Sequence, residues 1–496
     1  MSSEKMTTIG DVAEIFDGPH ATPQKIESGP YFLSISSLNK GILDLNQSAH
    51  LSEEDFKKWT KRVTPKPGDI LFSYETRLGE AAMMPAGVRA CLGRRMGLLR
   101  PDRSKVIPEF LLYSYLSPSF QSVIQQRKIH GATVDRIALK ELPFFPIRIP
   151  SLKEQQKVVD CLKGLDSKIQ LNHQINQTLE QMAQAIFKSW FVDFEPVKAK
   201  MEAKKRWHAL QPGNEPASPV CYAGEPQPLP DLDSYMNLAA MQAISGKTPE
   251  QLARMEREQP DQYARLRATA ELFPSAMQPS ELGEIPEGWE VSEIGKEVNV
   301  VGGGTPSTKN PEFWEGGNIH WTTPKDLSNL ADKVLINTDR KITSKGLAKI
   351  SSGLLPVDTV LMSSRAPVGY LALAKIPVAV NQGYIAMICE KRLSPEYVIQ
   401  WASANMDEIK SRASGTTFAE ISKKNFKIIP VIVPTDDVVS AYSLYVKNMY
   451  SEIEAKIRES HNLANLRDTL LPKLLSGEIT VPEAEAQLAK TGEMQA

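Results

Sequence analysis

Cysteine and histidine are both scarce in this chain of 496 residues, which contains four cysteines and seven histidines. The cysteines lie far apart without a CxxC pair, so the sequence predicts neither a structural zinc site nor a disulfide framework, and we expect buried, inert thiols. The histidines never cluster at metal-ligand spacing, and we expect no metal site. Long hydrophobic runs and a charged-then-apolar leader are also missing, so we expect a cytoplasmic protein without a membrane span.

The sequence motifs of common catalytic sites are missing too. There is no P-loop, no HExxH, no GxSxG, and none of the usual methyltransferase motifs. A nuclease-like pattern combines Asp231, in a Pro-rich segment, with Glu454 and Lys456 on a predicted helix, and we attribute it to chance. The glycine run 302–304 precedes no GxGxxG helix start, so it is interpreted as a tight turn with exposed polar tips. We therefore expect a chain with no catalytic residue and no bound cofactor.

The chain repeats itself once, over half its length. The segment Asp69–Gly79 returns as Thr359–Gly369 at an offset of 290 residues, and Pro150 returns as Pro434 at an offset of 284. The offset drifts in the first part of each copy, as loop insertions would produce, and is constant from Gly131 onward. Such self-similarity indicates two copies of one structural unit.

The segment with the constant offset predicts a long helix in each copy, because apolar residues recur at steps of three and four, as in a coiled-coil seam. Ser151 and Glu154 form a capping-box pattern after Pro150, and Asp436 follows Pro434 at the positive end of the second helix. We expect the two helices to pack on each other; packing of each helix on its own domain alone is the alternative. The predicted seam residues are Val158, Leu162, Leu165, Ile169, Leu179, Met182, Ile186 and Trp190, and Tyr442, Val446, Met449, Ile453, Leu463, Leu466, Leu470 and Leu474.

Asn172 and Asn176 interrupt the first stripe near seam positions. Polar seam residues cost stability but fix the register and orientation of paired helices. Local hydration of the helix is the alternative interpretation.

The predicted fold class is α+β, with two mixed α/β domains at residues 1–150 and 289–434, where short strands alternate with loops rich in Gly, Pro and Asn. The other predicted parts are the long helices at 151–195 and 435–478, a linker at 196–288 with a Pro-rich stretch and two short helices opening at Thr248 and after Pro260, and a flexible tail at 479–496.

Net charge is close to zero, with 58 Lys and Arg residues against 59 Asp and Glu residues. Along the chain, however, residues 1–150 carry +4 and residues 299–435 carry +5, whereas residues 151–298 carry −6 and residues 436–496 carry −4. A basic surplus in both copies favours a polyanion ligand with two contact sites.

Polar loops in both copies carry residue types that read DNA: Arg suits guanine, Asn and Gln suit adenine, and Lys and hydroxyl groups suit phosphates. We give most weight to Arg77 and Arg365, which follow the matched strands but do not align with each other. We give the same weight to the segments Gly131–Thr133 and Gly415–Thr417, which lie just before the matched Pro strands. The candidates in the first copy are Thr22, Lys25, Ser34, Ser36, Tyr74, Thr76, Arg77, Arg94, Arg95, Lys128 and Thr133. Those in the second copy are Thr305, Ser307, Lys309, Trp321, Lys325, Ser364, Arg365, Asn381, Gln382, Tyr384, Thr416, Thr417 and Lys423.

Three segments resemble the specificity subunit of type I restriction-modification systems. They are LEQMAQAIFKSWFVDFEP at 179–196, SELGEIPEGW at 280–289 and LRDTLLPKLLSGEI at 466–479, and the resemblance covers essentially the whole chain. It implies two target recognition domains in a pseudo-twofold repeat, joined by two long antiparallel coiled-coil helices. Each domain would read one half of a bipartite double-stranded DNA site, and the helices would set the gap.

The resemblance also implies the partners. Two methyltransferase subunits would carry S-adenosylmethionine and methylate adenine, and two restriction subunits would use ATP and Mg²⁺ for cleavage. The recognition loops vary within this family, so base contacts are not carried over to this chain. The long 196–288 segment departs from a minimal linker, and its lysine-rich start would meet phosphates or an acidic partner, or form a solvated helix. The alternatives are a stand-alone DNA-binding regulator, or a self-contained methyltransferase or nuclease with unfamiliar motifs.

Overall fold

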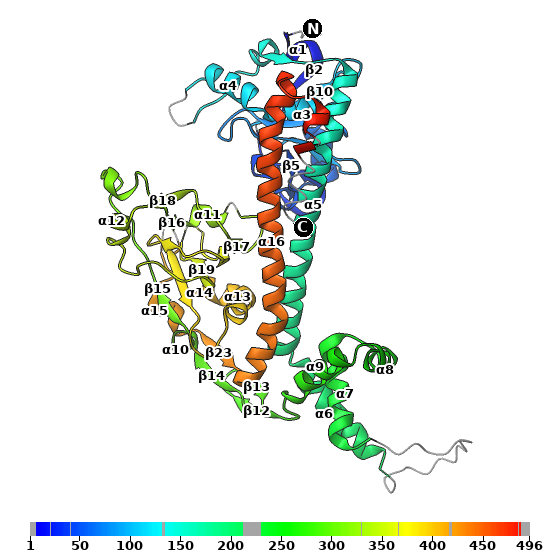
Figure 1. Ribbon diagram of the computed structural model, residues 1–496, viewed down its shortest axis with the longest axis vertical. Coiled ribbons are helices and arrows are strands. Elements are labelled where there is room, and N and C mark those ends of the chain that lie inside the picture. Colours follow the sequence, from blue (N-terminus) through cyan, green and yellow to red (C-terminus); the bar gives the residue numbers. More distant parts are fainter. Residues whose placement is uncertain are drawn as a thin grey trace, which may run out of the picture. The chain divides into compact units, whose positions relative to one another are not determined.

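The computed structural model describes residues 6–19, 21–39, 41–130, 134–211, 230–328, 330–365, 367–415, 419–484 and 486–487. The chain divides into two units, each described by itself below: unit 1 holds residues 1–170 and 460–496, and unit 2 holds residues 171–459. The division crosses both long helices, α5 (Leu152–Phe191) and α16 (Asp436–Ser476), so each unit contains a part of each helix (Figure 1).

Unit 1 begins with a mixed domain that ends where α5 starts. Its strands are β1 (Met6–Thr8), β2 (Ala13–Asp17), β3 (Ile26–Phe32), β4 (Leu38–Asn39), β5 (Ile42–Leu43), β6 (Ala49–His50), β7 (Ile70–Ser73), β8 (Ala81–Met83), β9 (Ala90–Cys91), β10 (Met96–Pro101) and β11 (Pro146–Arg148). Its helices are α1 (Ile9–Val12), α2 (Glu53–Trp59), α3 (Pro108–Leu116) and α4 (Pro118–Arg127).

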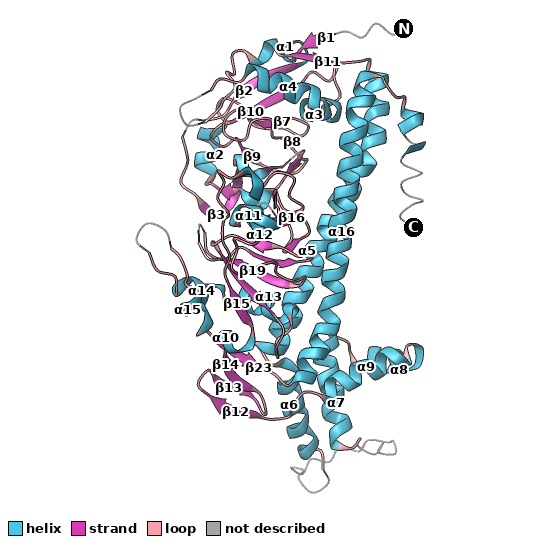
Figure 2. Cartoon of the chain, turned by 60° about the vertical axis from the view of Figure 1, so that its left-hand side comes forward, coloured by secondary structure: helices cyan, strands magenta, loops and turns pink. Residues whose placement is uncertain are grey.

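Unit 2 contains a second mixed domain, preceded by a group of helices and a short hairpin (Figure 2). Its strands are β12 (Met277–Ser280), β13 (Gly283–Pro286), β14 (Glu290–Glu293), β15 (Asn299–Val301), β16 (Ile319–Thr322), β17 (Val334–Leu335), β18 (Arg340–Ile342), β19 (Thr359–Ser363), β20 (Leu371–Ala374), β21 (Ala379–Val380), β22 (Tyr384–Ile388) and β23 (Pro430–Val433). The helices of this domain are α10 (Ile294–Glu297), α11 (Pro324–Ser328), α12 (Ser344–Leu347), α13 (Pro395–Ala404), α14 (Met406–Ser411) and α15 (Lys423–Lys427).

The two domains share one topology. Unit 1 contains the pair β1-β11, a four-stranded sheet in the order β2-β10-β7-β8 and a three-stranded sheet in the order β6-β3-β9. Unit 2 contains the pair β14-β23, the order β15-β22-β19-β20 with β17 added at the edge, and the order β18-β16-β21. The directions agree as well, since β9 is parallel to β3 and β21 is parallel to β16. The repeat predicted from the sequence is therefore confirmed as a repeat of topology.

Individual contacts repeat in the same way. Lys105 Nζ donates to the carbonyl of Asp11 at 2.9 Å, and Lys391 Nζ donates to the carbonyl of Lys296 at 2.7 Å. Each lysine ties the segment after the central sheet to the short helix that opens its domain. Equivalent side chains making equivalent bonds show that the two domains are built alike in detail.

The central strands are continuous apolar runs because both of their faces are covered. In β7, Ile70 and Phe72 enter the core that includes the long helices, whereas Leu71 enters a second core on the opposite face. In β19, Val360 and Met362 enter the core next to the long helices of unit 2, and Leu361 enters a separate one. Successive side chains of a strand point to opposite faces, so each strand joins two cores.

Both long helices begin as predicted, and their parts lie side by side within each unit (Figure 1). Ser151 and Glu154 form the predicted capping box: the Ser151 backbone N–H donates to the Glu154 carboxylate at 3.1 Å, and the Glu154 backbone N–H donates to the Ser151 hydroxyl at 3.4 Å. In unit 1, Leu162 of α5 packs with Leu470 of α16, and Arg467 pairs with Asp166 at 2.9 Å. Residues early in α5 thus meet residues late in α16, so the helices are antiparallel.

The α5 seam follows a heptad, with one correction to the prediction. Met182 is 47% exposed, whereas Ala183 is fully buried. The prediction is one residue out of phase with the heptad. Asn176 occupies a seam position, and the equivalent position one heptad later is residue 183. Asn172 is buried at the seam as well, and its side-chain amide donates to Glu459 of α16 at 3.0 Å.

The other predicted seam residues fall into two groups in the structure. The buried ones are Val158, Leu162, Leu165, Ile169, Trp190, Tyr442, Val446, Ile453, Leu470 and Leu474. Those packed against the cores while half-buried are Leu179, Ile186, Met449, Leu463 and Leu466.

The predicted linker at 196–288 is a folded helical group, which corrects the expectation of two short helices. Four helices form it: α6 (Glu195–Ala209), α7 (Leu232–Ser245), α8 (Pro249–Glu258) and α9 (Pro260–Glu271). Helices α8 and α9 begin where the sequence predicts, and Thr248 caps α8. Helices α6 and α7 were missed, and they pack on each other (Figure 2). Residues 212–229 of the Pro-rich stretch lie outside the described residues.

The basic residues at the start of this group do not all lie on the surface. Lys198, Lys204, Lys205 and Arg206 are exposed on α6. Lys200 is buried instead, and its Nζ donates to the carbonyl of Phe273 at 2.6 Å. Burial lowers the pKa of Lys200 to about 8. Lys200 therefore fastens α6 to the end of α9 rather than facing solvent.

The predicted flexible tail is partly folded. Ile479, Val481 and Ala484 pack against the core of unit 1. Residues 488–496 lie outside the described residues. None of the helices that the described residues form has the length and apolarity needed to span a bilayer.

Candidate nucleic-acid interface

The candidate residues of each domain lie at one edge of the central sheet, where one strand ends beside the start of its neighbour. Ser73 at the end of β7 pairs with Met96 at the start of β10, and Ser363 at the end of β19 pairs with Tyr384 at the start of β22. The turn after the first strand and the turn before the second are therefore adjacent in each domain. Most of the arginine and amide candidates lie on these turns.

In unit 1 the two turns are joined by Arg95. Its guanidinium lies 3.2 Å from the Glu75 carboxylate and donates to the Thr76 hydroxyl at 3.2 Å. Thr76 and Arg95 have φ angles of 72° and 70°. A left-handed backbone is uncommon for residues other than glycine, and a β-branched residue there is strained, so both positions are held by their surroundings. Strained residues of this kind concentrate at functional sites.

Arg77 is held differently from Arg95. One of its guanidinium nitrogens donates to the carbonyl of Ile35 at 3.1 Å, and the other lies 3.5 Å from Glu80. Ser36, beside Ile35, is exposed and shares a hydrogen bond of 2.8 Å with Ser34. These contacts link the turn after β7 to the turn after β3.

In unit 2 the equivalent turns line a cavity of about 420 Å³. Three candidates meet there: Lys325 at the start of α11, Arg365 after β19 and Asn381 before β22. Arg365 lies 3.7 Å from Glu420 and remains 40% exposed. The cavity thus presents an ammonium, a guanidinium and a side-chain amide together. Its lining residues are Thr323, Pro324, Lys325, Ser328, Arg365, Tyr370, Asn381 and Gly383.

The glycine run 302–304 is seated against the same edge of unit 2. A side chain at Gly303 would collide with the carbonyl oxygen of Val380, 1.8 Å from its Cβ position, so only glycine fits. Beyond the run, the Thr305 hydroxyl donates to the Gln382 side-chain oxygen at 2.7 Å. The run is irregular backbone and not the tight turn that the sequence predicts, and the segment after it carries Thr305, Ser307 and Lys309 on the surface.

Four candidates are buried, so the structure does not place their side chains on the surface. Tyr74 and Ser364 are 7% and 3% exposed, because each follows the central strand and points back into its domain. Burial, together with the nearby Asp17 carboxylate, raises the pKa of Tyr74. Trp321 and Tyr384 are also buried, and the Tyr384 hydroxyl donates to the carbonyl of Thr323 at 2.6 Å.

The remaining candidates divide by exposure. Thr22, Lys25, Arg94 and Lys423 are exposed, and Lys128 pairs with Asp135 at 2.8 Å. Thr133, Thr416 and Thr417 lie outside the described residues.

Sequence reasoning missed the partners that hold the arginines, Glu75 and Glu420, and an aromatic arrangement in unit 2. Arg340 lies over the Trp314 ring with its guanidinium carbon 3.6 Å from the ring centre, and Trp314 meets Trp321 edge to face. The two tryptophans of one loop-and-strand segment were a signal for this cluster. In the part of the chain that the structure describes, no group of three or more His, Cys, Asp or Glu side chains could hold a metal ion.

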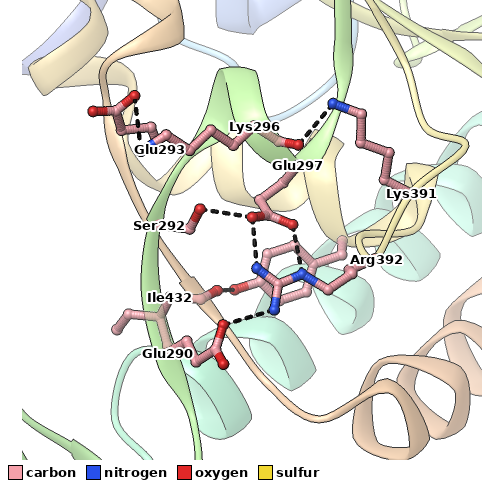
Figure 3. Close-up of polar contacts among 9 residues, drawn as sticks. Glu290, Ser292, Glu293, Lys296, Glu297, Lys391, Arg392 and Ile432 are labelled. Carbon is pink, nitrogen blue, oxygen red and sulfur yellow. Dashed lines mark hydrogen bonds and ion pairs between the residues drawn. The ribbon is translucent and has the colours of Figure 1, made fainter.

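The base of the unit 2 domain is fixed by a network around Arg392 (Figure 3). Its guanidinium donates two bonds to Glu297, at 2.7 and 2.9 Å, and one to Glu290 at 2.7 Å. The Ser292 hydroxyl donates to Glu297 as well, at 2.6 Å. The network joins β14, α10 and the segment before α13, and so fixes the position of the first strand and first helix of the domain.

Replacing Arg392 with Gln is expected to destabilise unit 2 by about 1–3 kcal/mol at neutral pH, because the buried Glu297 carboxylate loses charge-assisted hydrogen bonds. Hydrogen bonding to Arg392 holds the pKa of Glu297 below its ordinary value of 4.5. This stabilisation is therefore complete above that pH and is lost as pH falls through the lower pKa of the folded state. Urea unfolding at several pH values should show the difference between wild type and R392Q shrinking in acid.

Lys296→Gln is the matched control for this prediction. The Lys296 side chain forms an exposed ion pair with Glu293 at 3.5 Å, and its carbonyl, which accepts from Lys391, is unaffected by the substitution, so the change in stability should be less than about 1 kcal/mol. A difference between wild type and R392Q that stays constant across the acid range would contradict the assigned role of Glu297.

Comparison with known proteins gives a consistent result. The family model for the type I restriction modification DNA specificity domain matches residues 1–181 and 286–459. The HindI specificity subunit of Haemophilus influenzae is 31% identical over 429 residues, covering 84% of this chain and 87% of that protein. The putative MjaX specificity subunit of Methanocaldococcus jannaschii is 22% identical over 489 residues, covering 95% of this chain and 93% of that protein.

Among solved structures, a type I restriction-modification S subunit from M. genitalium aligns with a TM-score of 0.43 and 14% identity, covering 96% of this chain and 97% of that chain. The family model, however, covers well over half of the sequence, and the relative from Haemophilus influenzae spans most of both chains. This chain therefore belongs to the type I restriction-modification DNA specificity family.

Proposed function

We propose that the chain is the non-catalytic DNA-recognition subunit of a type I restriction-modification complex. Each domain reads one half of a bipartite double-stranded DNA target, and the paired helices fix the gap between the halves. The observation that carries this proposal is the duplication itself: one topology occurs twice, and each copy presents a carboxylate-held arginine on adjacent turns of its central sheet. Two domains of the same fold with different side chains on these turns suit a DNA target whose two halves differ in sequence.

The charge distribution supports contact with DNA. The domain segments 1–150 and 299–435 carry +4 and +5, and the acidic surplus lies in the segments that contain the long helices and α6 to α9. Lysines and hydroxyl groups around the arginines, such as Lys325 and Ser328, suit phosphates, whereas Arg365 and Asn381 suit base edges. The family to which the chain belongs is described as a DNA specificity domain.

The chemistry belongs to partner subunits in this proposal. Two methyltransferase subunits bind the helical scaffold and carry S-adenosylmethionine, with which they methylate adenine. Two restriction subunits supply ATP- and Mg²⁺-dependent cleavage. This chain binds none of these cofactors and works in the cytoplasm. The missing catalytic motifs in the sequence support this division of labour.

The proposal is tested by exchanging one domain. Residues 1–150 are replaced with the equivalent domain of a relative of different specificity, and the hybrid is produced with its methyltransferase subunit. Because each domain is expected to read its own half, sequencing of methylated adenines should show one half-site changed and the other half-site and the gap unchanged. A change in both halves would contradict the proposal.

The wild-type chain provides the control for catalysis. Incubated alone with S-adenosylmethionine and DNA, it is expected to transfer no methyl group, and addition of the methyltransferase subunit should start the reaction. Methyl transfer by the purified chain alone would favour a self-contained methyltransferase. Failure to co-purify with any methyltransferase subunit would favour a stand-alone DNA-binding regulator.

A further inference from the structure

The strand registers reveal which residues of the two domains are equivalent at the proposed DNA-reading turns. Glu75 lies two residues after Ser73, and Arg365 lies two residues after Ser363, its register equivalent. Each makes an isolated antiparallel bridge to a later segment, Glu75 with Arg136 and Arg365 with Glu420. The sequence offset of 290 residues pairs the same two positions, whereas Arg77 and Arg365 do not align.

A second pair of bridges supports this equivalence. Arg136 also bridges Ile129, and Glu420 also bridges Ser414, both antiparallel. The same small three-segment arrangement therefore recurs at the end of the central sheet in both domains. Arg136 and Glu420 occupy the same place in it, just as Glu75 and Arg365 do.

The charges on this arrangement are reversed between the domains. Unit 1 carries Glu75 opposite Arg136, whereas unit 2 carries Arg365 opposite Glu420. In unit 1 the guanidinium next to Glu75 comes from Arg95, which stands one residue before β10, at the position that Gly383 occupies before β22. The two domains share this three-segment arrangement, but the arginine that pairs with a carboxylate lies before β10 in unit 1 and after β19 in unit 2.

The backbone at Arg95 points to a functional reason for the arginine. Its φ angle of 70° is one that favours glycine, although the residue is an arginine. Keeping an arginine there costs conformational energy, and such strain persists where the surroundings enforce it, most often at functional sites. Both Arg95 and Arg365 remain more than a third exposed, at 36% and 40%, so both can reach a ligand.

We infer that Arg95 and Arg365 are specificity-determining residues, each of which contacts a guanine in the half-site of its own domain. Glu75 and Glu420 are positioning residues that orient the two guanidinium groups. The inference rests on the proposed function and adds the residues that carry it. A planar guanidinium makes two hydrogen bonds to the O6 and N7 atoms of guanine in the major groove, which fits an arginine held at one side by a carboxylate.

The test uses the chain assembled with its methyltransferase subunit, with methylated adenines mapped across a genome and binding measured on matched duplexes. Arg365→Gln should lower affinity for the wild-type target on the order of 10- to 100-fold and relax one guanine position in one half-site. Arg95→Gln should do the same in the other half-site. Arg89→Gln is the control, because Arg89 is also an exposed, carboxylate-paired arginine of the first domain, 2.8 Å from Glu53, but does not lie on these turns; it should leave every base preference unchanged.

The positioning residues have a readout of their own. Glu420→Gln should relax the same base position as Arg365→Gln, and Glu75→Gln the same position as Arg95→Gln, whereas a merely structural carboxylate would affect stability and leave base preference intact. Arg365→Lys keeps the charge without the planar fork, so it should lose the guanine preference while retaining nonspecific binding. This variant keeps the test informative if the glutamine variant folds poorly.

Two kinds of failure are distinguishable. If the wild-type complex modifies a bipartite target and none of the arginine variants changes a base preference, the residue assignment is wrong and the proposed function stands. Uniformly weaker binding with unchanged preferences would likewise overturn the assignment, since it would show phosphate contacts. A wild-type complex that recognises no bipartite target would overturn the proposed function itself.

Discussion

Inserting one heptad into each long helix, at facing positions, is expected to widen the gap between the two DNA half-sites by about three base pairs. Seven residues lengthen a helix by about 10 Å at 1.5 Å per residue, and base pairs are about 3.4 Å apart. The facing positions are given by the Asn172 amide, which donates to Glu459 at 3.0 Å. A full heptad keeps every later seam residue in phase, so the pairing on both sides of the insertion is preserved.

Methylated-adenine mapping measures this gap directly. The matched control places the same seven residues after Lys247, an exposed residue between α7 and α8, where the gap should stay as in wild type. A heptad added to α5 alone should shift Asn172 and Asn176 out of register with α16 and reduce activity rather than give a new gap. A paired insertion that leaves the modified sequence unchanged would show that the helices do not set the spacing.

The helices were predictable because their signal is periodic and local. Steps of three and four located the α5 and α16 seams, and the only seam residue found exposed, Met182, was an error of phase at a position next to Ala183. The strands β7 and β19 were also visible as matched apolar runs. Helix α7 was missed although Asp231 caps its start and Gly246 follows its end. Helix α6 is rich in exposed lysine, and one of its buried contacts joins Lys200 to Phe273 across 73 residues of sequence.

The candidate interface was only partly predictable, since residue type does not state which way a side chain points. Tyr74 and Ser364 have suitable chemistry but point into the core. Arg95 is one of many candidates in the sequence, and nothing local distinguishes it, because its left-handed backbone and its contact with Glu75, twenty residues away, are visible only in the structure. The sequence offsets of 290 and 284 residues already pair Glu75 with Arg365 and Arg136 with Glu420, but only the structure shows that Glu75 lies opposite Arg136 and Arg365 opposite Glu420.

Replacing Trp190 with Ala is expected to destabilise unit 2 by about 3–5 kcal/mol, the cost of removing a large, fully packed aromatic side chain. Trp190 is 1% exposed and belongs to the last turn of α5. Its ring lies 5.0 Å from that of Phe273 and 5.9 Å from that of Tyr442. One side chain thus joins α5, α16 and the segment after α9.

Urea unfolding and limited proteolysis measure this effect, with Trp207→Ala as the matched control. Trp207 is half-buried on α6 and makes one hydrogen bond, to the carbonyl of Pro230 at 2.9 Å, so its removal should cost far less. Trp190→Phe should retain much of the stability because it keeps a ring in the cluster. If W190A unfolds at the same urea concentration as wild type, the cluster is not what holds α5 to α16. If it unfolds early, DNA modification should fail with it, because a recognition domain loosened from its helix no longer has a defined distance to the other half-site.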